Sequence, residues 1–249
     1  MVLKTVSFNI RFGDDVNGYS VAERAPRLRQ AITDYDPDLI GIQEFTPMWE
    51  EYFERLFLPE YEMFNKYRAT SGWIEGSPVL WRRGAFDLCG SGYFWYSDTP
   101  DTESGGWDTS GHKRICVYVK LKHKASGTEF VFLNTHFGFG EECQIKSAEL
   151  IKTRTKAISD LPYFITGDFN AAPDTKAYAI MTSFLADANA KDLISITYHG
   201  YDPTSPACAH IDYCFVSTKV TPLKAKIITD TYGGKFPSDH YGLYAELQI

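Results

Sequence analysis

Hydrophobic runs of strand length alternate along this chain with segments in which apolar residues recur at helical spacing. Lys4–Ile10 alternates apolar and polar residues and is rich in β formers, which is typical of a strand. In Val21–Tyr35, Leu28 and Ile32 lie one helical turn apart, and the pattern stops before Pro37. The chain is therefore predicted to begin with a strand followed by a helix.

The same criteria locate the other elements. Further strands are predicted at Leu39–Gln43, Pro78–Trp81, Phe86–Tyr96, Arg114–Lys122, Glu129–His136, Tyr163–Gly167, Ile211–Ser217, Lys224–Ile228 and Tyr241–Leu247. Further helices are predicted at Thr46–Leu56, with Thr46 as N-cap before a first-turn proline, at Glu142–Ser159 and at Ala177–Phe184. Residues 97–113 and 198–209 are predicted to be loops. Because strands and helices alternate without a linker or a repeat, residues 1–249 are expected to form one α/β domain.

Composition narrows the class of protein. The formal net charge is −7, which disfavours non-specific attraction to nucleic acid without excluding a local basic groove. The five cysteines are odd in number and form no C-x-x-C pair, so buried thiols in a reducing compartment are expected rather than disulfides or a zinc site. Neither a membrane-spanning apolar run nor a signal peptide is visible, so a cytoplasmic protein is expected.

Acidic, amide or imidazole side chains stand at the ends of four predicted hydrophobic strands. The four segments are Ser7-Phe8-Asn9, Ile42-Gln43-Glu44, Leu133-Asn134-Thr135-His136 and Ile165-Thr166-Gly167-Asp168-Phe169-Asn170. Unpaired charge at the end of a buried strand is costly unless something compensates it, and a bound cation is one such compensation. Carboxylate and amide oxygens without a cysteine cluster suit Mg²⁺, Mn²⁺ or Ca²⁺ better than zinc.

Each of these residues also has a purely local interpretation. Asn9 is explained by the end of a strand, Glu44 by a helix cap, and His136 by a satisfied turn. The Gly167–Asn170 segment has the composition of an Asx-type turn. Two later segments, Ile211-Asp212-Tyr213 and Ser238-Asp239-His240, raise the same choice. Six such segments in one chain are hard to explain as turns alone, so a shared site is favoured.

Taken together and in this order, these segments resemble the endonuclease/exonuclease/phosphatase superfamily. Gly167-Asp168-Phe169-Asn170 and Ser238-Asp239-His240 are the most specific pieces, and the resemblance covers essentially the whole chain. The Asn134-Thr135-His136 form is more similar to the deadenylase, sphingomyelinase and inositol-phosphatase branches than to the abasic-site endonucleases. The resemblance implies a DNase I-like, four-layer sandwich of two packed mixed β-sheets flanked by helices.

The resemblance also implies a metal-assisted attack of water on phosphorus. It implies Mg²⁺, with Mn²⁺ as an alternative, held by Asn9, Glu44 and Asp239. It implies that Asp168 orients or deprotonates the water, while Asn170 and His136 donate hydrogen bonds to phosphoryl oxygens. The remaining implied pair is Asp212 with His240, which stabilises the transition state or transfers a proton. One-metal and two-metal schemes both fit these residues.

The substrate-facing positions are less well defined. Trp107-Asp108 and His112-Lys113-Arg114-Ile115-Cys116 resemble a group of small, mostly uncharacterised bacterial members, which makes Arg114 a candidate substrate contact. Trp107, in the polar loop, is a second candidate. The sequence departs from that group at Phe137-Gly138-Phe139, where an Asp-His pair is common, and at Gln144, where arginine is common.

Three functions follow from these observations. The preferred one is a phosphoesterase that hydrolyses a phosphodiester or a phosphomonoester. Its substrate is expected to be a small-molecule, lipid-linked or sugar phosphate, because the chain is acidic. The first alternative is a Mg²⁺-dependent 3′ exonuclease or deadenylase-like nuclease. The second alternative is a degenerate phosphoester-binding module, which is disfavoured because every core motif is present. The oligomeric state stays open.

Overall fold

The computed structural model describes all residues 1–249 and contains two six-stranded mixed sheets. In spatial order the first sheet contains β11 (Thr221–Ile228), β12 (Gly242–Gln248), β1 (Val2–Asn9), β2 (Leu39–Gln43), β4 (Val79–Arg82) and β3 (Tyr61–Phe64). The second contains β5 (Phe86–Trp95), β6 (Ile115–His123), β7 (Glu129–His136), β8 (Tyr163–Asp168), β10 (Asp212–Val216) and β9 (Ala186–Asp187). Each sheet has one parallel pair near its middle, β1 with β2 and β7 with β8.

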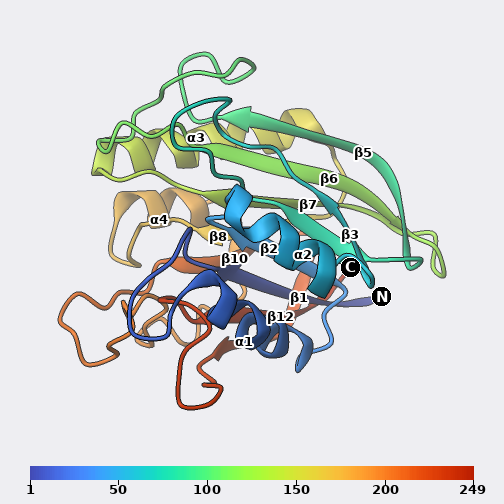
Figure 1. The fold of residues 1–249 in the computed structure, drawn as a ribbon. Helices are drawn as coiled ribbons and strands as arrows, with labels where there is room; N and C mark the ends of the chain where they lie inside the picture. Colours follow the sequence, from blue (N-terminus) through green and yellow to red (C-terminus); the bar gives the residue numbers. More distant parts are fainter.

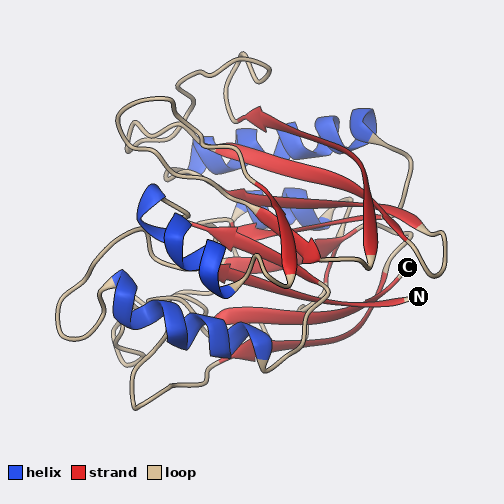
Figure 2. Ribbon diagram, turned by 45° about the vertical axis from the view of Figure 1, so that its right-hand side comes forward, coloured by secondary structure: helices blue, strands red, loops and turns tan.

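Helices cover the outer faces of both sheets, as Figures 1 and 2 show. On the first sheet lie α1 (Val21–Thr33) and α2 (Glu50–Leu56), and the second is covered by α3 (Glu141–Ile158) and α4 (Lys176–Thr182). The chain ends lie together, since the Met1 ammonium donates to the Ile249 carbonyl. The predicted DNase I-like sandwich of four layers is therefore confirmed. No helix is both long enough and apolar enough to cross a membrane.

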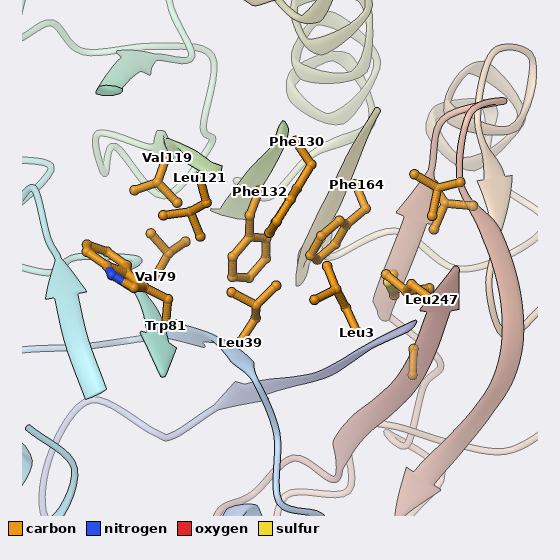
Figure 3. Close-up of a cluster of buried hydrophobic side chains, with 14 of the residues drawn as sticks. Leu3, Leu39, Val79, Trp81, Val119, Leu121, Phe130, Phe132, Phe164 and Leu247 are labelled. Atoms are coloured by element: carbon orange, nitrogen blue, oxygen red, sulfur yellow. The ribbon is translucent and has the colours of Figure 1, made fainter. Parts of the chain in front are cut away.

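The main core lies between the two sheets (Figure 3). Phe130, Phe132 and Phe164 point from the second sheet toward Leu3 and Leu39 of the first. These side chains are almost fully buried, and two smaller clusters fill the spaces between each sheet and its helices. Three separate apolar layers explain why the central strands carry apolar residues at nearly every position.

A small polar cluster crosses between the sheets next to this apolar core. The side-chain amide of Gln43 donates to Asn134 Oδ1 at 2.7 Å, and the Thr166 hydroxyl donates to the same oxygen at 2.9 Å. Asn134 Nδ2 in turn donates to three backbone carbonyls, that of Ile42 in β2 and those of Ser77 and Pro78 just before β4. Gly41 permits this close approach, because a Cβ there would lie 2.3 Å from Thr166 Oγ1. We call Gln43, Asn134 and Thr166 the inter-sheet polar cluster.

Most predicted elements are present with boundaries shifted by one or two residues, but three details differ. Thr46 is not a side-chain cap; its hydroxyl donates to the Phe12 carbonyl at 2.7 Å. The helix predicted from that point begins instead as a 3-10 turn over Pro47–Trp49. The short edge strands β3 and β9 were not predicted, because four and two residues carry too little periodicity.

Candidate active site

The polar strand ends meet at one end of the sandwich, where both sheets contribute to a cavity of about 390 Å³. The parallel pairs bring Asn9 beside Gln43 and His136 beside Asp168, and antiparallel pairing places Asp212 opposite Asp168. Eleven residues line the cavity: Arg11, Glu44, His136, Phe139, Asp168, Asn170, Tyr198, Ala209, Ile211, Asp239 and His240. Six of the eight predicted catalytic and metal-binding residues are therefore cavity-lining.

The other two predicted residues, Asn9 and Asp212, are buried and contact the lining residues. Asn9 Nδ2 donates to Glu44 Oε1 at 3.1 Å and to Asp168 Oδ2 at 3.0 Å, so one amide joins residues from both sheets. Glu44 also accepts from the backbone N–H of Phe12 at 2.8 Å. Its φ of 63° is unusual for a residue with a side chain, and such strain is common at functional sites.

Asn9, Glu44 and Asp239 are the three residues predicted from the sequence to hold a divalent cation. All three offer oxygen atoms, and Ser238, whose hydroxyl donates to the Asn9 carbonyl at 2.7 Å, connects the segment of Asp239 to the end of β1. Burial raises the pKa of Glu44, and the nearby Glu75 and Asp239 carboxylates raise it further. A bound cation would offset this crowding of negative charge, and hard oxygen donors suit Mg²⁺.

A second group, Asp168, Asp212 and His240, also has candidate ligand atoms within 4.8 Å of one another. His240 Nδ1 lies 2.9 Å from Asp212 Oδ2, and His240 Nε2 lies 3.8 Å from Asp168 Oδ2. Burial alone would lower the pKa of His240, but the Asp212 carboxylate, together with those of Asp168 and Asp239, outweighs burial and raises this pKa to about 10. A charged imidazole paired with a carboxylate is suited to stabilising phosphoryl charge, so we do not assign this group to a metal.

Glu75 is a buried acid of this site that the sequence did not single out. Its Oε1 lies 3.2 Å from His136 Nδ1 and 2.9 Å from Arg68 Nη1, and the opposite nitrogen of His136 lies 3.5 Å from Asp168 Oδ2. Glu75 therefore orients the His136 ring toward the cavity. The sequence does contain an indication of this residue. In Glu75-Gly76-Ser77-Pro78 an acid comes shortly before a buried strand, whereas in the other segments the polar residue stands at the end of a strand.

Glu75→Gln is expected to make the free energy of unfolding less dependent on pH in the acidic range. Burial would raise the pKa of Glu75, but its contacts with His136 and Arg68 lower it from 4.5 to about 2. A lowered folded-state pKa stabilises the protein above pH 4.5, and that contribution, about 3 kcal/mol at most, is lost as the pH falls toward 2. The variant is expected to be less stable at pH 7 by about 3–5 kcal/mol, because Arg68 stays buried without its partner.

Urea unfolding of the parent protein and of Glu75→Gln between pH 7 and pH 3 checks this prediction. The two stability curves should converge as the pH falls below 4.5. Curves that stay parallel over this interval would show that Glu75 does not titrate with a lowered pKa.

Neither predicted substrate contact lines the cavity. Arg114 is buried, donates through Nε to Asp108 Oδ2 at 2.6 Å and lies 3.9 Å from Glu75. Trp107 packs against α3, where the Lys146 ammonium lies 5.4 Å from its ring centroid, and it borders a separate, open surface groove. Arg114 is therefore a buried neighbour of Glu75 that does not reach the cavity, and Trp107 lies at a different surface groove.

The two positions at which the sequence departs from the bacterial group both touch the site. Gln144 Nε2 donates to the Asn170 backbone carbonyl at 2.5 Å, and Asn170 Nδ2 donates to the Phe137 carbonyl at 3.0 Å. Phe139 lines the cavity with 48% of its surface exposed. These residues hold Asn170 in its left-handed backbone conformation, φ 48°, and give the cavity an apolar wall.

Two further lining residues, Arg11 and Tyr198, were not predicted from the sequence. Arg11 follows Asn9, a candidate metal ligand at the end of a strand, by two positions. This proximity in the sequence could have indicated that Arg11 lies at the site. Tyr198 lies in the 198–209 loop, and its ring centroid lies 5.0 Å from that of His240. Loop residues such as Tyr198 have no periodic pattern that places them at a site.

The fold and this cluster of carboxylate, amide and imidazole groups define the class of DNase I-like phosphoesterases. The sequence pattern of the Endonuclease/Exonuclease/phosphatase family matches residues 6–125 and 144–240. The chain therefore belongs to this family and is a hydrolase of phosphoric ester bonds. The family is generally dependent on divalent metals, in agreement with the crowding of carboxylates around the buried Glu44.

Three relatives illustrate the similarity. A family member from Bacteroides thetaiotaomicron is 30% identical, with a TM-score of 0.90 over 99% of this chain and 97% of that one. The mannosyl-6-phosphatase of B. thetaiotaomicron VPI-5482 is also 30% identical, with a TM-score of 0.91 over 99% of this chain and 100% of that one. The uncharacterized protein L388 of Acanthamoeba polyphaga mimivirus is 26% identical over 182 residues, which are 68% of this chain and 67% of that protein.

Proposed function

We propose that this protein is a Mg²⁺-dependent phosphoesterase that acts on a small phosphate ester of the sugar-phosphate class. The observation that carries the proposal is the size and lining of the cavity. Its volume of about 390 Å³ lies in the range of small-molecule sites. Arg11 is the only lysine or arginine among its eleven lining residues, whereas a polynucleotide site requires a track of basic side chains.

Two groups of residues divide the chemistry. Asn9, Glu44 and Asp239 would hold Mg²⁺, which supplies polarisation of a phosphoryl oxygen and offsets charge on the leaving group. Asp168 orients the attacking water and accepts its proton. Asp168 is held for this task, because it accepts from Asn9 Nδ2 at 3.0 Å and from the Asn170 backbone at 2.9 Å.

His136, Asn170 and His240 surround the position where the phosphoryl group would lie. All three line the cavity and carry N–H groups, and the rings of His136 and His240 lie against Glu75 and Asp212 respectively. Donors that are held in place before the reaction stabilise charge on phosphoryl oxygens without a reorganisation cost. The similarity to a mannosyl-6-phosphatase over the whole chain supports a sugar phosphate as the substrate class.

A substrate panel with and without Mg²⁺ tests the proposal. Hexose phosphates, a phospholipid headgroup ester and a single-stranded oligonucleotide are offered to the parent protein, and release of phosphate or nucleotide is measured. Hexose phosphate should be turned over, and EDTA should abolish that turnover. Preferential cleavage of the oligonucleotide would favour the nuclease alternative, and binding of Mg²⁺ without hydrolysis of any ester would favour a binding module.

A further inference from the structure

Arg11 is the only permanent positive charge on a cavity wall that also contains three carboxylates. Its Nε lies 3.9 Å from Asp239 Oδ2, so it faces the segment that includes a proposed metal ligand. The side chain is 31% exposed, which leaves it accessible from the cavity. A cation in this place can bind a further negative charge of the substrate, beyond the charge that the catalytic groups contact.

The guanidinium group is fixed in direction by its neighbours. Nε and Nη2 donate to the two oxygens of Asp15 at 3.0 and 3.2 Å, and the Tyr201 hydroxyl donates to Asp15 at 3.3 Å. The guanidinium carbon lies 4.3 Å from the centroid of the Phe12 ring. These contacts leave Nη1 without a hydrogen-bond partner in the protein. An arginine held on one edge presents its free edge to a ligand with little loss of side-chain freedom.

The backbone of Arg11 is held as firmly as its side chain. Its φ of 59° is rare for a residue with a side chain. Its N–H donates to Asn9 Oδ1 at 3.0 Å, and its carbonyl accepts from Trp49 Nε1 at 3.1 Å and from Arg24 Nη2 at 3.2 Å. The chain therefore keeps a costly conformation that directs this residue toward the cavity, which is the usual signature of a functional constraint.

We infer that Arg11 recognises a third non-bridging phosphate oxygen and thereby selects phosphomonoesters over phosphodiesters; this rests on the proposed function. A monoester carries three non-bridging oxygens that share two negative charges. In a diester, one of these oxygens carries a second carbon group, and one negative charge is absent. Hydrolysis of the monoester breaks the phosphorus–oxygen bond to the alcohol and forms one to water, which yields the alcohol and inorganic phosphate.

The test compares a hexose 6-phosphate with the methyl diester of the same phosphate, in Mg²⁺, for the parent protein and Arg11→Gln. Loss of a charge-assisted hydrogen bond should lower kcat/KM for the monoester roughly 10- to 100-fold more than for the diester. Arg29→Gln is the matched control, because Arg29 lies on the outer helix α1, pairs with Glu60 and does not line the cavity. Its ratio of monoester to diester kcat/KM should equal that of the parent.

The outcomes separate this inference from the proposed function. Turnover of both esters with a ratio that Arg11→Gln does not change would overturn the inference alone, as would a parent protein that prefers the diester. Turnover of neither ester would overturn the proposed function as well. If Arg11→Gln fails to fold, competition in the parent decides: inorganic phosphate should inhibit at least about tenfold more strongly than dimethyl phosphate. Equal inhibition would overturn the inference.

Discussion

Asp168→Asn is expected to lower turnover by a factor on the order of 10³–10⁴ while leaving Mg²⁺ affinity close to that of the parent. The carboxylate accepts hydrogen bonds on both oxygens, from Asn9 Nδ2 and from the Asn170 N–H. An amide keeps the size of the side chain but cannot take a proton from water. Calorimetric Mg²⁺ titration and steady-state kinetics on the same preparation measure the two quantities.

Glu44→Ala is the matched comparison for Asp168→Asn. It is expected to weaken Mg²⁺ binding, so that part of its lost activity returns at high Mg²⁺ concentration. A Mg²⁺ affinity in Glu44→Ala equal to that of the parent would contradict the metal assignment. Near-ultraviolet circular dichroism of both variants shows whether the sandwich is still packed.

Asp212→Asn is expected to lower kcat by a factor on the order of 10³–10⁴, about as much as the loss of Asp168. Asp212 Oδ2 lies 2.9 Å from His240 Nδ1, and this contact fixes the orientation of the ring and stabilises the proton on Nδ1. The amide removes the negative charge that favours the cationic ring. Because binding of the substrate would change less, kcat should fall much more than KM rises.

Asp187→Asn provides the control for this prediction. Asp187 is also a buried carboxylate of the second sheet, where it accepts from the Tyr178 hydroxyl at 3.1 Å and from the Asn189 backbone at 2.8 Å. It does not line the cavity, so its variant should keep the parent kcat. A similar loss of kcat in both variants would assign the effect of Asp212→Asn to general destabilisation.

The architecture could be predicted because its central strands are long and their apolar pattern is strong. Leu39–Gln43 and Glu129–His136 were located to the residue, since each is bounded by polar or turn residues. The short strands Tyr61–Phe64 and Ala186–Asp187 were missed because they depend on pairing with a neighbour rather than on their own sequence. Which face of each sheet a helix covers is decided by contacts between distant residues, which periodicity cannot show.

The candidate site was predictable where a side chain ends a strand or directly follows it. Asn9, Glu44, His136 and Asp168 share that position, and the structure brings them together, while their catalytic roles stay predictions. Glu75 was missed because it precedes its strand. Arg114 was a candidate substrate contact from loop resemblance alone, but it is buried in an ion pair with Asp108 and does not line the cavity. Such pairing between loop residues is set by tertiary structure.

The inter-sheet polar cluster of Gln43, Asn134 and Thr166 has a mechanical consequence. Asn9 ends β1 of the first sheet, Glu44 directly follows β2 and Asp239 precedes β12, whereas His136, Asp168 and Asp212 belong to strands of the second sheet. Apolar surfaces resist separation but oppose sliding only weakly, because dispersion and burial have little direction. Directional hydrogen bonds resist shear. The hydrogen bonds of the cluster therefore fix the position of one sheet relative to the other. Apolar substitutions in the core can then accumulate without displacing the two halves of the site.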